Sequence, residues 1–130
     1  MKKPSDRYRA MEEATQKPED ALIRAYAQCV ELLIKAKTAM AAGGGDSATI
    51  GTAIRGGHQV LMSLCGALDH EVFPELSSSL EQTYLGLMQS LTTAQIRNDV
   101  DEIQRVIDII NDVRNSWEDA VRETGTLPKG

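Results

Sequence analysis

The chain has 130 residues, a formal net charge of −5 and a pI near 5.0, and its Lys and Arg residues are scattered along its length. This length suits one domain with its own hydrophobic core, and the acidic balance argues against a nucleic-acid-binding surface. No stretch approaches the roughly 18 consecutive apolar residues of a membrane span. The N-terminus also lacks the apolar run of a secretory signal, so we expect a cytoplasmic protein with no membrane insertion.

Residues 1–17 are mostly polar, and only Tyr8 and Met11, at positions i and i+3, could form an anchoring turn. We expect a mobile N-terminal arm over 1–17, a helical bundle over 18–124 and a tail over 125–130. The first helix should begin at Pro18, because proline suits the first helical position and the acidic residues Glu19 and Asp20 follow it. Its apolar residues repeat at spacings of four and three: Leu22, Tyr26, Cys29, Leu33, Ala36 and Met40.

The glycine run at 43–45 ends this helix, and Asp46 or Ser47 should cap the next one. The same spacing recurs in the second helix, at Ile50, Ile54, Gly57, Leu61, Leu64 and Leu68. Two adjacent glycines, Gly56 and Gly57, lie inside it, and each costs about 1 kcal/mol relative to alanine. They indicate either a close approach of another helix or a local bend.

A turn over 69–74 precedes a third stripe: Leu76, Leu80, Tyr84, Leu87, Leu91 and Ala94. The last helix should span 98–123, with Asp99 and Glu102 forming a capping-box-like start and Gly125 following its end. Its seam comprises Ile103, Val106, Ile110, Val113, Trp117 and Ala120, flanked by Val100, Ile107 and Ile109. We expect Trp117 to be largely buried in this seam.

This apolar arc is about 180° wide, whereas a surface helix needs only about 100° to face a core. The extra width predicts contact with more than one neighbour, either other bundle helices or a bound peptide helix. Four helices joined by short loops make the fold class all-α, as an antiparallel up-down-up-down four-helix bundle.

Little in the sequence indicates catalysis. Neither His58 nor His70 has a second His, Cys or Glu at i+3 or i+4, so we expect no metal and no cofactor. The acidic residues beside His70 point in different directions, which is typical of a solvated corner. Cys29 and Cys65 fall in apolar helix patterns and should be reduced thiols. The protein is therefore expected not to be an enzyme.

An alternative function concerns His58, which lies partway along a helix beside two glycines. Histidine phosphotransfer domains expose their phosphoacceptor in such a setting. Those domains usually place Lys and Gly just after the histidine, whereas Gln59 and Val60 follow here.

The order of features resembles the flagellin-specific export chaperone family, FliS, over nearly the whole chain. The resemblance rests on an early tyrosine before a proline-started helix, a Leu…Tyr…Leu run and an Arg…Trp pair in the last helix. Its residues are Tyr8, Pro18, the run 21–26, Val60, Leu61, Leu64, Leu68, Asp69, Leu80, Tyr84, Leu87, Leu91, Val113, Arg114 and Trp117. The chain departs from the family in the first helix, where Ala25-Tyr26-Ala27-Gln28-Cys29 replaces Leu-Tyr-Asp-Gly-Ala.

This resemblance implies a helical bundle that binds the disordered C-terminal segment of flagellin, or a related exported subunit, in the cytoplasm. Such a chaperone prevents premature polymerisation and presents its client to an export gate component; a weak homodimer is also allowed. An amphipathic client segment would fold into grooves between helices. The residues we predict to bind the partner are Tyr8, Met11, Ile103, Val106, Ile107, Ile109, Ile110 and Val113.

Overall fold

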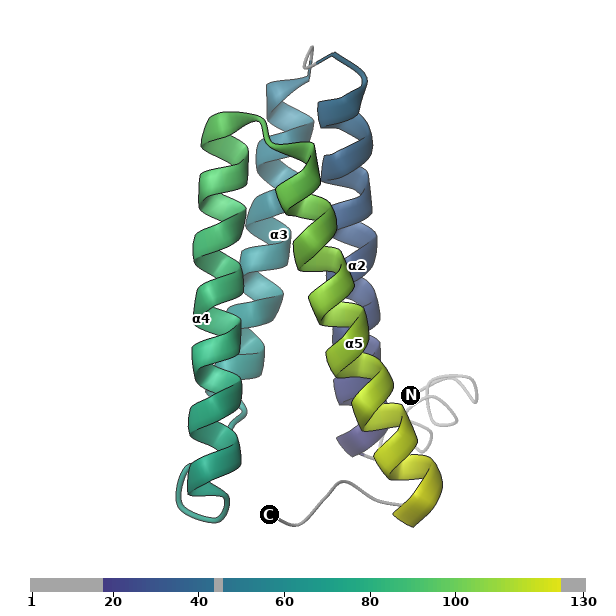
Figure 1. The fold of residues 1–130 in the computed structure, drawn as a ribbon, viewed down its shortest axis with the longest axis vertical. Coiled ribbons are helices and arrows are strands. Elements are labelled where there is room, and N and C mark those ends of the chain that lie inside the picture. Colours follow the sequence, from purple (N-terminus) through teal and green to yellow (C-terminus); the bar gives the residue numbers. More distant parts are fainter. Residues whose placement is uncertain (1–17, 44–45, 125–130) are drawn as a thin grey trace, which may run out of the picture.

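The computed structural model describes residues 18–43 and 46–124, which form four helices and no strand. These helices are α2 (Pro18–Ala41), α3 (Ser47–Gly66), α4 (Pro74–Arg97) and α5 (Val100–Thr124). They run alternately up and down, and each packs against two neighbours in the cyclic order α2, α3, α4, α5 (Figure 1). The predicted antiparallel four-helix bundle is confirmed. The arm with Tyr8 and Met11 and the tail after residue 124 lie outside the described residues.

The ends of the helices follow from local chemistry. Helix α2 begins at Pro18 as predicted. The Asp46 carboxylate caps α3 by accepting the backbone N–H of Thr49 at 3.0 Å. Only half of the predicted capping box forms at α5: Asp99 accepts the backbone N–H of Glu102 at 3.1 Å, while the Glu102 side chain turns to Arg105 instead.

A left-handed Asn98, with φ of 52°, joins α4 to α5. Asparagine tolerates this conformation better than most residues. The connection is therefore tight enough to place the two helices side by side at that end of the bundle (Figure 1).

The core changes in character along the bundle. Near the Asn98 turn it contains Ala36, Ala53 and Ala94, whereas the other half contains Tyr26 and Tyr84 with Trp117 beside them. Small side chains allow helices to approach, and aromatic side chains need more room. Figure 1 shows the corresponding taper, since α4 and α5 lie close at the turn and diverge toward the aromatic end.

The paired glycines mark a close approach of α2 to α3. A Cβ atom on Gly56 would lie 3.1 Å from Leu32 Cδ1, and one on Gly57 would lie 3.0 Å from Leu33 Cδ2. Of the two readings left open by the sequence, close packing is the one observed. None of the described helices is long and apolar enough to cross a membrane.

Candidate partner-binding surfaces

The apolar residues predicted on α5 are mostly core residues. Ile103, Val106, Ile107 and Ile110 are 0–3% exposed, and they are closed off by α2 on one side and α4 on the other. Ile107, which the sequence places beside the seam, is therefore part of the core. A helix at the corner of a bundle uses its wide apolar arc to meet two neighbours. Of the predicted α5 contacts, only Ile109 and Val113 are partly exposed.

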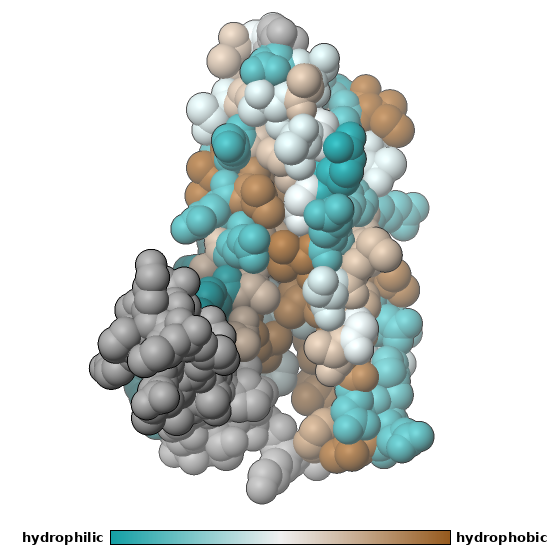
Figure 2. Space-filling view, turned by 180° about the vertical axis from the view of Figure 1, so that it is seen from behind, coloured by the Kyte–Doolittle hydropathy of each residue, from teal (hydrophilic) through white to brown (hydrophobic). Residues whose placement is uncertain are grey.

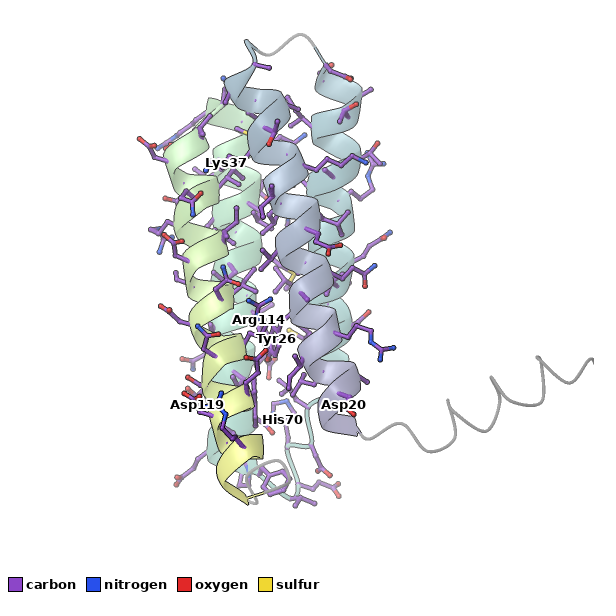
Figure 3. All side chains as sticks on the ribbon, turned by 90° about the vertical axis from the view of Figure 1, so that its right-hand side faces the viewer. Asp20, Tyr26, Lys37, His70, Arg114 and Asp119 are labelled. Carbon is purple, nitrogen blue, oxygen red and sulfur yellow. The ribbon has the colours of Figure 1, made fainter. Side chains whose placement is uncertain are left out.

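Trp117 packs against the core but is less deeply buried than predicted. Its Nε1–H donates to the Tyr26 hydroxyl at 3.0 Å, and the Tyr26 and Tyr84 hydroxyls bond to each other across the bundle. Burial raises the pKa of both tyrosines, so the hydroxyls stay protonated. Figure 3 shows Tyr26 between α2 and α5 in the half of the bundle away from Lys37. This hydroxyl cluster ties α2, α4 and α5 together where the helices diverge.

A groove of about 570 Å³ lies on the outer side of the α2–α3 contact. Leu32, Gly56 and Val60 provide apolar or small surface, and Arg55 is the only ionisable residue among the described residues that line it. The remaining lining residues are Gln28, Thr52, Gln59 and Ser63. Sequence reasoning missed this groove, although the short residues at 52, 56 and 63 recur near helical spacing on one side of α3. These residues leave a groove next to Leu32 because their side chains are small.

The chain was compared with known proteins. The family model described as "Flagellar protein FliS" matches residues 1–124, nearly the full length. The chain belongs to the FliS family. None of the curated proteins compared with it is a match.

FliS proteins are chaperones of flagellar export, which gives this chain its general role. The described part of the bundle is consistent with a role based on binding. Asp69, His70 and Glu71 form the expected solvated corner: the Asp69 carboxylate accepts the backbone N–H of Glu71 at 3.1 Å, and His70 pairs with Glu81 at 3.1 Å. Among the described residues, no group of three or more His, Cys, Asp or Glu side chains could hold a metal ion.

Both cysteines of this FliS protein are free thiols, as predicted. Cys29 is buried, and burial raises the pKa of its thiol to about 12. Its Sγ lies 3.8 Å from the backbone oxygen of Gly57, at the close contact of α2 and α3. It thus behaves as a small core residue. Cys65 is partly exposed, and burial together with the nearby Glu81 carboxylate of α4 raises the pKa of its thiol.

His58 does not have the setting of a phosphoacceptor. Its ring is half-buried between α3 and α4, and Nε2 lies 3.3 Å from the Thr92 hydroxyl. Burial also lowers the pKa of the imidazole. A phosphoacceptor must present a ring nitrogen to an incoming domain, whereas Nε2 here already has a partner in Thr92 of α4. The phosphotransfer alternative thus has no support in this geometry.

Proposed function

We propose that this FliS protein binds the disordered C-terminal segment of flagellin, or of a related exported subunit, in the cytoplasm. It holds the segment until an export gate component receives it and so prevents premature polymerisation. Family membership supports the chaperone role, and the α2–α3 groove is the observation that carries the mode of binding. Catalysis and cofactors have no part in this function.

The groove suits an amphipathic segment that folds as it binds. Leu32 and Val60 offer apolar contact in the groove, and Leu32 packs directly against Gly56 of α3. Polar side chains of Gln28 and Gln59 line the rest, as expected for a rim that meets the polar face of a helix. Because folding on binding uses part of the interaction free energy, the complex stays weak enough to release its client.

In this proposal, only two of the residues predicted on α5 contact the client. Ile109 and Val113 are accessible enough to extend a client site on the α4 side of α5. Ile103, Val106, Ile107 and Ile110 would have to leave the core to touch a client, so we assign them to stability. The arm residues Tyr8 and Met11 remain predicted contacts that shield a client surface until flagellin displaces them.

Binding of a labelled flagellin C-terminal peptide, followed by fluorescence anisotropy, tests the groove. The variant Ser63→Arg places a large charged side chain at an exposed lining position and should weaken binding at least tenfold, or about 1.4 kcal/mol. Thr38→Arg is the matched control, since Thr38 is an exposed α2 residue outside the groove. Both variants should keep wild-type helicity in circular dichroism.

Three results would count against the proposal or relocate the site. Peptide binding unchanged by Ser63→Arg but lost with Ile109→Arg would move the client to α5. Equal losses for Ser63→Arg and Thr38→Arg would show that charge rather than contact weakens binding. No binding of the peptide to the wild-type protein would refute flagellin as the client.

A further inference from the structure

The polar residues that line the α2–α3 groove can all donate hydrogen bonds, and none of them is acidic. The chain has 19 Asp and Glu residues against 14 Lys and Arg residues, yet the described residues that line the groove include no carboxylate. Its polar lining residues are Gln28, Thr52, Arg55, Gln59 and Ser63. The groove therefore offers hydrogen-bond donors and one positive charge on the surface of a protein that is acidic overall.

These donors are not used within the described part of the bundle. None of the five polar side chains forms a hydrogen bond or an ion pair with another described residue. Arg55 is exposed and is the only Asp, Glu, Lys or Arg on the 20 residues of α3. On the α2 side, Glu31 and Lys35 are exposed and opposite in sign, so together they leave the charge of Arg55 uncompensated. Its guanidinium can thus pair with an incoming anion without first breaking a contact.

The donors of α3 are concentrated around Arg55. Thr52 precedes it by three residues and Gln59 follows it by four, and residues at these spacings lie on the same side of a helix. Gln28 of α2 lines the opposite wall. Figure 2 views the bundle from the side of α2 and α3 and shows apolar residues along the middle of this face, with polar residues on both sides. A segment that covers the apolar middle brings its own polar edge to these donors.

We propose that Arg55 binds a carboxylate of the client, either an Asp or Glu side chain or the carboxylate at the end of the client chain. This inference rests on the proposed function, because it names the chemical group that the same groove recognises. A guanidinium presents parallel N–H donors that match the two oxygens of a carboxylate, and Thr52 and Gln59 supply further donors beside it. Apolar contacts alone let a helix shift along a groove, whereas a single charge pair fixes its position.

The expected effect is moderate and depends on salt. Ion pairs at an exposed position contribute less than partly buried ones, and a client in the groove covers Arg55 from one side only. The screening length falls from about 10 Å at about 0.1 M salt to about 3 Å at about 1 M. We therefore expect the pair to strengthen client binding about fivefold at the lower salt concentration and to contribute little at the higher one.

Fluorescence anisotropy with the labelled flagellin C-terminal peptide tests the role of Arg55. Arg55→Gln should weaken binding about fivefold at low salt, and wild type and variant should converge at high salt. Arg55→Lys should lie between them, because lysine keeps the charge and loses the planar fork. Arg97→Gln is the matched control, since Arg97 is also exposed, lies on α4 outside the groove and forms no ion pair among the described residues. It should bind like wild type.

Altered peptides identify which carboxylate is bound. One series replaces each Asp by Asn and each Glu by Gln, one at a time, and a further peptide carries an amide at its C-terminus. One of these changes should weaken binding to wild type about fivefold and have no further effect on Arg55→Gln, because the two changes remove the same pair. Coupling to a side-chain replacement indicates an acidic residue, and coupling to the amide indicates the chain end.

The carboxylate contact is overturned if Arg55→Gln binds the peptide like wild type, or if Arg97→Gln loses as much affinity. It is also overturned if no altered peptide couples to Arg55. Ser63→Arg separates this failure from failure of the groove itself, since Ser63 lies eight residues from Arg55, about 12 Å along the helix axis. Weaker binding with Ser63→Arg and normal binding with Arg55→Gln would keep the groove and refute the carboxylate contact. No binding of the peptide to wild type would refute both.

Discussion

Substituting alanine for three glycines tests the packing of α2 against α3. Glycine within a helix costs about 1 kcal/mol relative to alanine, so each substitution begins with a gain of that size. At Gly86 nothing lies within 4 Å of the new Cβ, and the full gain should appear. At Gly56 the new Cβ would lie 3.1 Å from a terminal methyl of Leu32, which is partly exposed and can rotate toward the groove. Most of the gain should remain there.

Gly57 should behave in the opposite way. Its new Cβ would lie 3.0 Å from Leu33 Cδ2 and 3.7 Å from Leu91 Cδ1, and both leucines are fully buried. Overpacking in a close-packed core costs about 1–3 kcal/mol, which exceeds the helix-propensity gain. Gly57→Ala should therefore be neutral to destabilising, by up to about 2 kcal/mol.

Urea unfolding followed by circular dichroism measures these differences directly. Gly86→Ala is the reference for helix propensity alone. Gly56→Ala should shift the urea midpoint in the same direction as Gly86→Ala, and Gly57→Ala should leave the midpoint unchanged or shift it in the opposite direction. The corresponding change in melting temperature is about 4 °C per kcal/mol for a chain of this size. If Gly57→Ala stabilised the protein as much as Gly86→Ala, the close contact would not limit the packing, and our reasoning about the paired glycines would be refuted.

Three further predictions concern single side chains. Tyr26→Phe should cost about 2–3 kcal/mol because it strands both the Tyr84 hydroxyl and the Trp117 Nε1–H, whereas Tyr84→Phe should cost only about 1 kcal/mol because Tyr26 keeps its bond from Trp117; equal costs in urea unfolding would contradict the central position of Tyr26. Asp46→Ala should lower the melting temperature and Asp46→Asn should not, since both carboxylate and amide can cap α3; the pKa of Asp46 is lowered by its bonds from Thr49, so this contribution is present above the unfolded pKa near 3.8 and is lost as the pH falls through the folded value. Burial lowers the pKa of His58 in the folded protein, so below the unfolded pKa of about 6.5 the unfolded chain binds more protons than the folded one, and wild-type stability should decrease as the pH is lowered through that range. The stability of the His58→Gln variant should decrease less. If the melting temperatures of the two proteins changed in parallel from about pH 7.5 to about pH 5, burial of this ring would be contradicted.

The sequence was sufficient to predict the helices because their start and stop signals are local. Pro18, Asp46 and Asp99 act within one turn of the residues they cap, and the apolar spacing of each helix reflects its own buried side. The hydroxyl cluster could not be predicted in the same way. Tyr26 and Trp117 are 91 residues apart, and nothing in their local pattern indicates that their polar atoms meet.

The candidate site was harder to predict than the fold because an apolar arc does not reveal what covers it. The wide apolar arc of α5 was compatible with further bundle contacts or with a bound peptide, and most of it packs against α2 and α4. The groove beside Gly56 forms because several residues on that side of α3 have short side chains, and a search for periodic apolar residues does not detect short side chains. The groove appears only in the structure, where Leu32 of α2 packs against Gly56 and borders it.

The outer faces of the helices differ in how many charged residues they carry. Helix α5 has a mostly buried seam on one side and a charged outer face, including Asp108, Asp112 and Asp119, which suits contact with water. Helices α3 and α4 bury a narrower stripe and leave uncharged or apolar residues outside it. Desolvating such residues costs less than desolvating charges, so a client should bind on the α3 side, where the groove lies. Because α5 buries most of its apolar residues within the bundle, the helix with the strongest amphipathic pattern in the sequence mainly stabilises the fold, and the weaker pattern of α3 leaves surface for recognition.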